Sequence, residues 1–162
     1  MADKSELVNN IEMPEGMNPE VLRHIMYPEN YGKLESPDGT GVAMDDKTGE
    51  FVIFTLKLAK DGIEDIKFAT NGCQDTVVVG SMFTDMVKDE SVEYAKKAIS
   101  KIEEKLGGLS PQQKICADMV FNAFIAALIN VTNLAQGEKE EMHVIKSEES
   151  CEIPTLEGKE NE

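Results

Sequence analysis

The sequence predicts an α+β domain in which a small antiparallel three-stranded sheet packs against several helices. Apolar residues alternate with a period of two between residues 51 and 70, and from residue 75 to 133 they recur at helical spacing. Strands that are grouped together, with most of the helices after them rather than between them, are typical of the α+β class. The 162 residues are enough for one such domain.

A β-hairpin is predicted from two runs of alternating residues. The first run covers 51–59, and the returning strand covers 63–70, with apolar side chains at Ile63, Ile66 and Phe68. Asp61-Gly62 lies between them and is a strong turn signal, because glycine tolerates the positive φ of a tight hairpin turn. Residues 41–47 predict an additional strand at the sheet edge.

Helices are predicted where a capping residue precedes apolar residues at helical spacing. Asn18 can cap a short helix over 19–26, and Ser91 a helix that ends near residue 106. The clearest start is Ser110, with Pro111 at the first position and Gln113 completing a capping box; this helix runs to about residue 133. A further helix over 75–88 directly follows the hairpin.

The two ends of the chain differ in composition from the middle. Residues 1–18 are polar without a clear period and predict a flexible leader. Residues 137–162 contain nine Glu against three Lys and only scattered apolar side chains, which predicts an acidic disordered tail. The remaining residues, 19–136, form the predicted domain.

Charge and composition exclude several classes of function. The formal net charge is −15, and an acidic surface repels phosphate backbones and anionic lipids, so neither nucleic acid nor membrane is an expected partner. No secretion signal or membrane-spanning run is apparent, and the three cysteines are an odd count. We therefore expect a cytoplasmic protein whose cysteines serve as thiols, thiolates or metal ligands rather than as a disulfide framework.

Cys73 is the strongest candidate for chemistry. It follows Asn71-Gly72 between a strand and a helix start, where backbone N–H groups and the helix dipole favour a thiolate, which is both a nucleophile and a soft-metal ligand. A small buried thiol at a tight turn is the other interpretation. Cys116 on the last helix is a core residue unless the fold brings it beside Cys73. Cys151 in the tail is either an incidental thiol or a ligand that reaches a metal site.

Conventional enzyme catalysis has little support in the sequence. The two histidines, His24 and His143, lack metal-binding spacing; His24 is predicted to be structural and His143 to be solvated. No glycine-rich phosphate loop, CxxC pair or Ser/His/Asp set is visible. We therefore expect a protein that is not an enzyme.

Three motifs stand out between residues 21 and 131: His24 followed by YPENYG at 27–32, the stretch DGIEDIKFATNGC at 61–73, and the helix GSMFTDMVKDESVEYA at 80–95. With these motifs, the chain resembles the IscU/NifU amino-terminal-domain family of iron–sulfur cluster assembly scaffolds over about residues 21–131. The resemblance implies the α+β fold given above, and it implies that Cys73 and Cys116 match two of the family's three cluster-binding cysteines.

The sequence departs from the family's ligand pattern at two positions. The Cys-Gly-Asp motif of the family corresponds to Thr48-Gly49-Glu50, so a hydroxyl replaces the first thiolate while Glu50 keeps a carboxylate. Ile115 replaces the histidine that precedes the last cysteine. The resemblance then implies a metal site of Cys73, Cys116 and Glu50, with Cys73 and Cys116 also binding the cluster.

The resemblance implies a scaffold that binds iron or a labile [2Fe–2S] cluster, with zinc as a substitute, and transfers it to acceptor proteins. A cysteine desulfurase and iron–sulfur acceptor proteins are the implied partners, and a homodimer or a redox complex is a candidate assembly. Thr48 and Ile115 keep an alternative open. In that alternative, the chain is a degenerate scaffold homologue that acts as a non-assembling interaction subunit or regulator of a redox or iron–sulfur protein complex.

Overall fold

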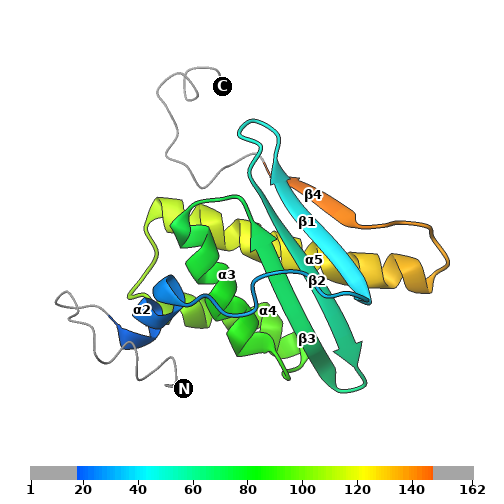
Figure 1. Ribbon diagram of the computed structural model, residues 1–162, viewed down its shortest axis with the longest axis horizontal. Coiled ribbons are helices and arrows are strands. Elements are labelled where there is room, and N and C mark those ends of the chain that lie inside the picture. Colours follow the sequence, from blue (N-terminus) through cyan, green and yellow to red (C-terminus); the bar gives the residue numbers. More distant parts are fainter. Residues whose placement is uncertain (1–17, 148–162) are drawn as a thin grey trace.

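The computed structural model describes residues 18–147; the predicted leader up to residue 17 and residues 148–162 of the predicted tail lie outside them (Figure 1). In chain order the elements are α2 (Pro19–Met26), β1 (Gly39–Asp45), β2 (Phe51–Ala59), β3 (Gly62–Thr70), α3 (Gln74–Val87), α4 (Val92–Lys105), α5 (Pro111–Ala135) and β4 (His143–Ser147). Helices α3 and α5 lie on one face of the sheet, and α4 packs against α3. The predicted α+β class is confirmed.

The sheet has four strands in the order β3-β2-β1-β4, so the prediction of three strands is wrong by one. Pairing of β1 with β2 and of β2 with β3 is antiparallel, as predicted. The fourth strand pairs in parallel with β1, from Gly41↔His143 to Asp45↔Ser147. Strand β1 was expected at the sheet edge, but it lies between β2 and β4.

Strand β4 comes from residues that were predicted to be a disordered tail, and for 143–147 that prediction is wrong. A carboxylate explains why the segment is held: Glu140 accepts hydrogen bonds from Asn130 Nδ2 at 2.9 Å and Asn133 Nδ2 at 3.0 Å on α5. These bonds fix the chain just before the strand, so that β4 can pair with the open edge of β1. His143 bonds to the same carboxylate at 3.1 Å and is partly buried rather than solvated.

Helix α5 lies very close to β1, because glycine occupies the points of approach. A Cβ on Gly41 would lie 2.0 Å from the backbone nitrogen of Ala127 and 2.4 Å from the carbonyl oxygen of Ala123. Real atoms do not approach so closely, so a larger residue at position 41 would push the helix off the strand. Ala123 and Ala127 are fully buried and form the helix side of this contact.

The core is aliphatic with a small group of aromatic rings at its centre. Phe54 of β2 lies edge-on to Phe83 of α3 and to Phe124 of α5, with ring centroids 5.8 and 6.3 Å apart. Phe83 and Phe124 also meet edge-to-face at 5.1 Å. Edge-to-face pairs of this kind add to the stability gained by burial. They join the sheet to the two helices that carry the cysteines.

The predicted helix starts are confirmed in detail. Asn18, Ser91 and Ser110 cap α2, α4 and α5, and each side chain accepts a backbone N–H of the first turn. The capping box between Ser110 and Gln113 is formed in both directions. At the hairpin the two-residue loop is Lys60-Asp61, and Gly62 begins β3, where a Cβ would lie 2.3 Å from the carbonyl oxygen of Glu90.

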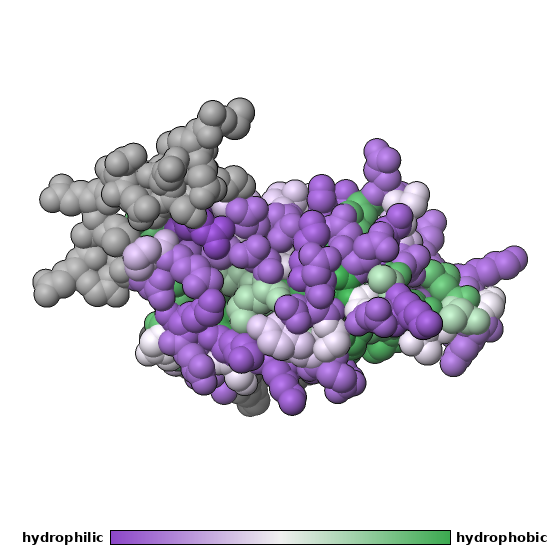
Figure 2. Space-filling model, turned by 90° about the horizontal axis from the view of Figure 1, so that it is seen from below, coloured by the Kyte–Doolittle hydropathy of each residue, from purple (hydrophilic) through white to green (hydrophobic). Residues whose placement is uncertain are grey.

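Helix α5 is long and apolar enough, by length and composition alone, to cross a membrane. Half of its most apolar window is buried inside the protein, against the sheet and α3. A core helix of a soluble protein has the same composition. One face of the molecule, drawn in Figure 2, is mostly hydrophilic, with apolar side chains in separate smaller areas, as its strong net negative charge would suggest.

Candidate functional site

Cys73 lies at the junction between β3 and α3, as the N-cap residue of α3. Its backbone is extended, with φ −73° and ψ 175°, and its carbonyl accepts the N–H groups of Thr76 and Val77 at 3.0 and 3.2 Å. The sulfur makes no capping bond to the helix. It is partly buried and lies 3.7 Å from the Thr76 hydroxyl. The backbone therefore starts the helix without using the cysteine side chain.

Cys116 lies in the second turn of α5 and is fully buried. Its sulfur is 3.7 Å from the sulfur of Cys73, although the two residues are 43 positions apart in sequence. The capping box at Ser110 fixes where α5 begins and so determines which helical turn faces Cys73. The fold thus brings together the two cysteines that the sequence singled out.

Thr48, Gly49 and Glu50 form the loop between β1 and β2. Gly49 has φ +78°, in the left-handed region that favours glycine, and its N–H donates to the carbonyl of Asp45 at 2.8 Å. The Thr48 hydroxyl donates to Glu50 Oε1 at 3.2 Å and accepts the Glu50 N–H at the same distance. Glu50 is only 7% exposed, so the loop turns its carboxylate inward.

Hydrogen bonds hold this loop against the turn that carries Cys73. Asn71 accepts the Phe51 N–H at 2.8 Å and donates to the carbonyl of Gly49 at 3.0 Å. Thr70 Oγ1 donates to the Phe51 carbonyl at 2.6 Å and accepts the Gly72 N–H at 2.9 Å. Glu50 Oε2 lies 3.4 Å from the point that a Cβ on Gly72 would occupy. The Glu50 carboxylate therefore lies close to Gly72, the residue that precedes Cys73.

The sulfur separation suits a shared soft metal ion. Two sulfur ligands at ~2.3 Å from one tetrahedral ion lie about 3.8 Å apart, and the observed distance is 3.7 Å. Within residues 18–147, however, no three His, Cys, Asp or Glu side chains gather in a metal-holding group. The described residues therefore bring two sulfur atoms together, with Glu50 beside Gly72. Contrary to the expectation of free thiols, Cys116 is disulfide-bonded in this structure, so its sulfur becomes a thiolate ligand only once it is reduced. The ligand roles of Cys73, Cys116 and Glu50 stay predictions.

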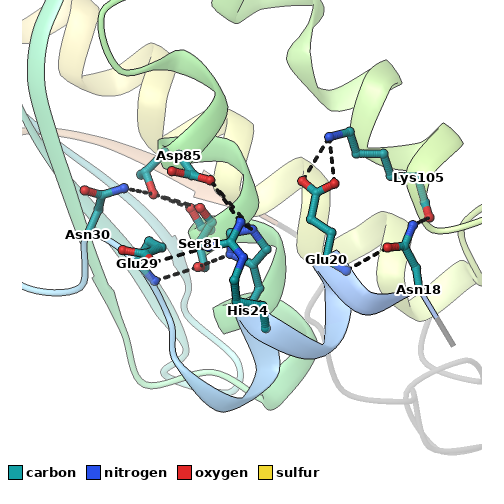
Figure 3. Close-up of polar contacts among 11 residues, drawn as sticks. Asn18, Glu20, His24, Glu29, Asn30, Ser81, Asp85 and Lys105 are labelled. Atoms are coloured by element: carbon teal, nitrogen blue, oxygen red, sulfur yellow. Dashed lines mark hydrogen bonds and ion pairs between the residues drawn. The ribbon is translucent and has the colours of Figure 1, made fainter. Parts of the chain in front are cut away.

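His24 belongs to a separate polar cluster, as its predicted structural role requires (Figure 3). It is fully buried, and its Nδ1 lies 2.6 Å from Ser81 Oγ on α3. The guanidinium of Arg23, which can only donate, lies 3.3 Å from Nε2, so the ring proton belongs on Nδ1. Burial, and then the charge of Arg23, lower the pKa of His24, which keeps the ring neutral.

The same cluster fixes the loop after α2. Ser81 Oγ accepts the Glu29 N–H at 2.7 Å, and Asn30 Nδ2 donates to Thr84 Oγ1 at 3.1 Å. Figure 3 shows these side chains converging between α2, this loop and α3. The His24 and YPENYG motif of the sequence therefore joins the N-terminal helix to the helix that Cys73 caps.

Sequence reasoning missed the residues that support the site. Asn71 was noted only as the end of a strand, Thr70 as its last residue, and Ser81 as part of a matching helix. Their partners lie 19 to 57 residues away, so no local pattern shows them. The one available signal was the short polar run Thr70-Asn71-Gly72 between an apolar strand and an apolar helix.

Comparisons with known proteins agree with this architecture. Residues 17–136 match the profile of the family described as NifU-like N terminal domain. The chain is 36% identical over 152 residues to the iron–sulfur cluster assembly scaffold protein IscU of Aquifex aeolicus, covering 87% of this chain and 96% of that one. It is 34% identical over 111 residues to IscU 1 of Archaeoglobus fulgidus, covering 68% and 72%.

Solved structures extend the agreement to the fold. The N-terminal part of a nitrogen-fixing NifU-like protein from Brucella abortus superposes with a TM-score of 0.57 at 16% identity, over 72% of this chain and 94% of that one. At this identity the likeness concerns the fold alone. With the family profile spanning most of the described residues and the IscU relatives above 30% identity, this chain belongs to the NifU-like N-terminal domain family.

Proposed function

We propose that this protein is an iron–sulfur cluster assembly scaffold. It binds iron or a labile cluster at the Cys73–Cys116 pair and transfers it to acceptor proteins. The observation that carries the proposal is the 3.7 Å sulfur separation at a helix start. It occurs in a chain that matches 96% of the length of the IscU scaffold protein of Aquifex aeolicus. The names of such relatives favour the scaffold over a non-assembling interaction subunit.

The chemistry of the donors supports a soft metal as cargo. When both sulfurs are thiolates they suit iron, zinc or the iron of a [2Fe–2S] cluster, and a carboxylate such as Glu50 can complete the set. The site holds and passes on its cargo, so the protein is not an enzyme in its own right. A cysteine desulfurase would supply sulfur to Cys73 or Cys116, and the acidic chain would work in the cytoplasm.

Anaerobic reconstitution tests the proposal. The full chain, with its cysteines reduced, is incubated with ferric iron and sulfide, desalted, and measured for bound iron, bound sulfide and visible circular dichroism. We expect bound iron and sulfide in equal amounts, and transfer of the cluster to an added apo-ferredoxin. Cys73→Ser should abolish uptake, whereas Ser100→Ala, an exposed serine on α4, should not change it.

Two results would contradict the scaffold. One is a wild-type protein that retains no iron and sulfide after desalting. The other is Cys73→Ser retaining as much cluster as the wild type, which would place the cluster elsewhere. Far-ultraviolet circular dichroism of each variant controls for folding, since Cys116 in particular is a core residue.

A further inference from the structure

The two edges of the sheet differ in how their outward backbone groups are hydrogen-bonded. At the β3 edge, the N–H and C=O of Phe68 form hydrogen bonds of 3.0 and 2.7 Å with the backbone of residues 30–32. The N–H and C=O of Thr70 form bonds of 3.2 and 2.8 Å with the Tyr31 hydroxyl. The Ile66 N–H donates to the carboxylate of the preceding residue at 2.9 Å. These bonds close the β3 edge to a further strand between residues 66 and 70.

Strand β4 forms the other edge of the sheet, and only its inner side is paired. It comes last in the strand order β3-β2-β1-β4 and pairs in parallel with β1. Alternate residues of an edge strand turn their N–H and C=O groups away from the sheet. Within residues 18–147, nothing bonds to the backbone of β4 from its outer side. This edge therefore offers a row of donors and acceptors to an additional strand.

The side chains at the β4 edge are apolar or paired with an opposite charge. Met142, just before the strand, and Val144 are 39% and 41% exposed, and residues two apart in an extended segment lie on the same face. The strand contains one lysine, Lys146, whose ammonium group lies 3.0 Å from the Asp46 carboxylate. The edge thus lacks an unpaired lysine of the kind with which proteins commonly keep edge strands apart.

A second copy of this chain suits such an edge. Two β4 strands can pair antiparallel about a two-fold axis near Val144, which brings the exposed apolar side chains of both copies together. The formal net charge of the chain is −15, so repulsion between copies is smallest where the facing strands are apolar or charge-paired. A strand edge of this kind has no charge complementarity to a basic or acidic partner, whereas it is complementary to itself.

We propose that β4 is a self-association surface, through which two copies of this chain join their four-stranded sheets into one. Glu140 holds the start of the strand through its bonds to Asn130 and Asn133, so β4 is ordered before the copies meet and pairing costs less conformational entropy. Because the β3 edge is closed, strand pairing ends at two chains instead of continuing into a filament. The inference does not depend on the proposed function.

Sedimentation equilibrium of the full chain over a range of concentrations tests the proposal. The wild type should shift from one chain to two as the concentration rises, with no larger species. Val144→Lys should raise the dissociation constant about tenfold or more, because it removes apolar contact in both copies and places two like charges near the axis. Non-reducing electrophoresis of the same samples excludes chains that are joined by a disulfide.

Met26→Lys is the matched control for this substitution. Met26 is 42% exposed, close to the value for Val144, and it lies on α2, on the opposite side of the molecule from β4 in Figure 1. The same change of charge at this position should leave the dissociation constant as in the wild type.

Mixing two variants separates self-pairing from a failure to fold. Val144→Lys and Val144→Glu should each be monomeric at concentrations where the wild type is dimeric. An equimolar mixture should form a dimer with one copy of each, because opposite charges then meet near the axis. A wild type that stays monomeric throughout, a Val144→Lys chain that dimerises like the wild type, or a mixture that stays monomeric would each overturn the proposal.

Discussion

Two clusters of chemically reactive side chains lie against helix α3, and they differ in how fully their polar atoms are hydrogen-bonded. At the His24–Ser81 cluster, near the middle of α3, both ring nitrogens and the serine hydroxyl have hydrogen-bond partners between 2.6 and 3.3 Å. At the start of α3, the contacts of the Cys73 sulfur within residues 18–147 are long, at 3.7 Å to Thr76 and to Cys116. The polar atoms of the His24–Ser81 cluster are therefore fully hydrogen-bonded, whereas the Cys73 sulfur is not.

Under the proposed function, this difference separates a structural site from a functional one. A buried polar group with all its partners fixes the fold, and removing it leaves other groups without partners. A thiol contributes little by hydrogen bonding, so under the proposed function the two cysteines serve through what their reduced sulfurs would bind. The supporting bonds at the second site come instead from Thr70 and Asn71, which hold the backbone around the sulfur.

The largest expected effect breaks the saturated cluster. His24→Ala removes a fully buried ring and takes one hydrogen-bond partner from each of Ser81 and Arg23, so the free energy of unfolding should fall by ~2–4 kcal/mol. Cys73→Ala, on the same helix, should change it by less than about 1 kcal/mol. Urea denaturation followed by circular dichroism measures both. Equal losses in the two variants would contradict the division into structural and functional sites.

The next largest expected effect is tighter cluster binding when a thiolate is added near Cys73 and Cys116. Thr48→Cys places a thiolate where a hydroxyl now bonds to Glu50, and Gly49 already provides the loop conformation it needs. Thiolate binds iron far better than a neutral hydroxyl, so chelator-driven loss of a reconstituted [2Fe–2S] cluster should slow by about tenfold. The His24 cluster and the urea midpoint should be unaffected. If Thr48→Cys loses its cluster as fast as the wild type, position 48 does not face the cargo.

Much of the fold could be predicted because its signals are local. Capping by Asn18, Ser91 and Ser110 is visible within four residues of each helix start, and the alternation of β2 and β3 within a dozen. Strand β4 could not be predicted in this way. It pairs with a strand about 100 residues earlier, and its approach is held by Glu140, which in the sequence looks like one more charge in an acidic tail.

The site could be predicted only in part, and for a similar reason. The position of Cys73 at a strand-to-helix turn follows from its neighbours in sequence, but its proximity to Cys116 came from the family resemblance and not from spacing. The bonds from Asn71 and Thr70 to the β1–β2 loop depend on the register of the hairpin. That register places Glu50 opposite Gly72, which no pattern of residue types shows.

The dependence of stability on pH tests the structural role of His24. Its pKa in the folded state lies below the usual 6.5 because of burial and Arg23. As the pH falls, His24 is therefore protonated in the unfolded chain before it is protonated in the folded one. The stabilising contribution of the neutral ring is fully present above pH 6.5 and is lost as the pH falls toward the lower pKa of the folded state. The urea midpoint of the wild type should decrease as the pH is lowered from 7 to 5. In His24→Gln it should decrease less. A parallel fall in His24→Gln would assign the effect to other groups.

The smallest effect concerns strand β4. Hydrogen bonds from Asn130, Asn133 and His143 lower the pKa of Glu140 to about 2. The contribution of this carboxylate to stability is therefore present above pH 4.5 and is lost as the pH falls from there to about 2. Glu140→Gln should loosen the start of β4 without disturbing the α2–α3 contact. Amide hydrogen exchange should then quicken at Val144 and Ile145 while that of Ser81 and Thr84 stays unchanged. If exchange quickens equally in both regions, β4 and the His24 cluster unfold as one unit. A mutation in one region would then always destabilise the other.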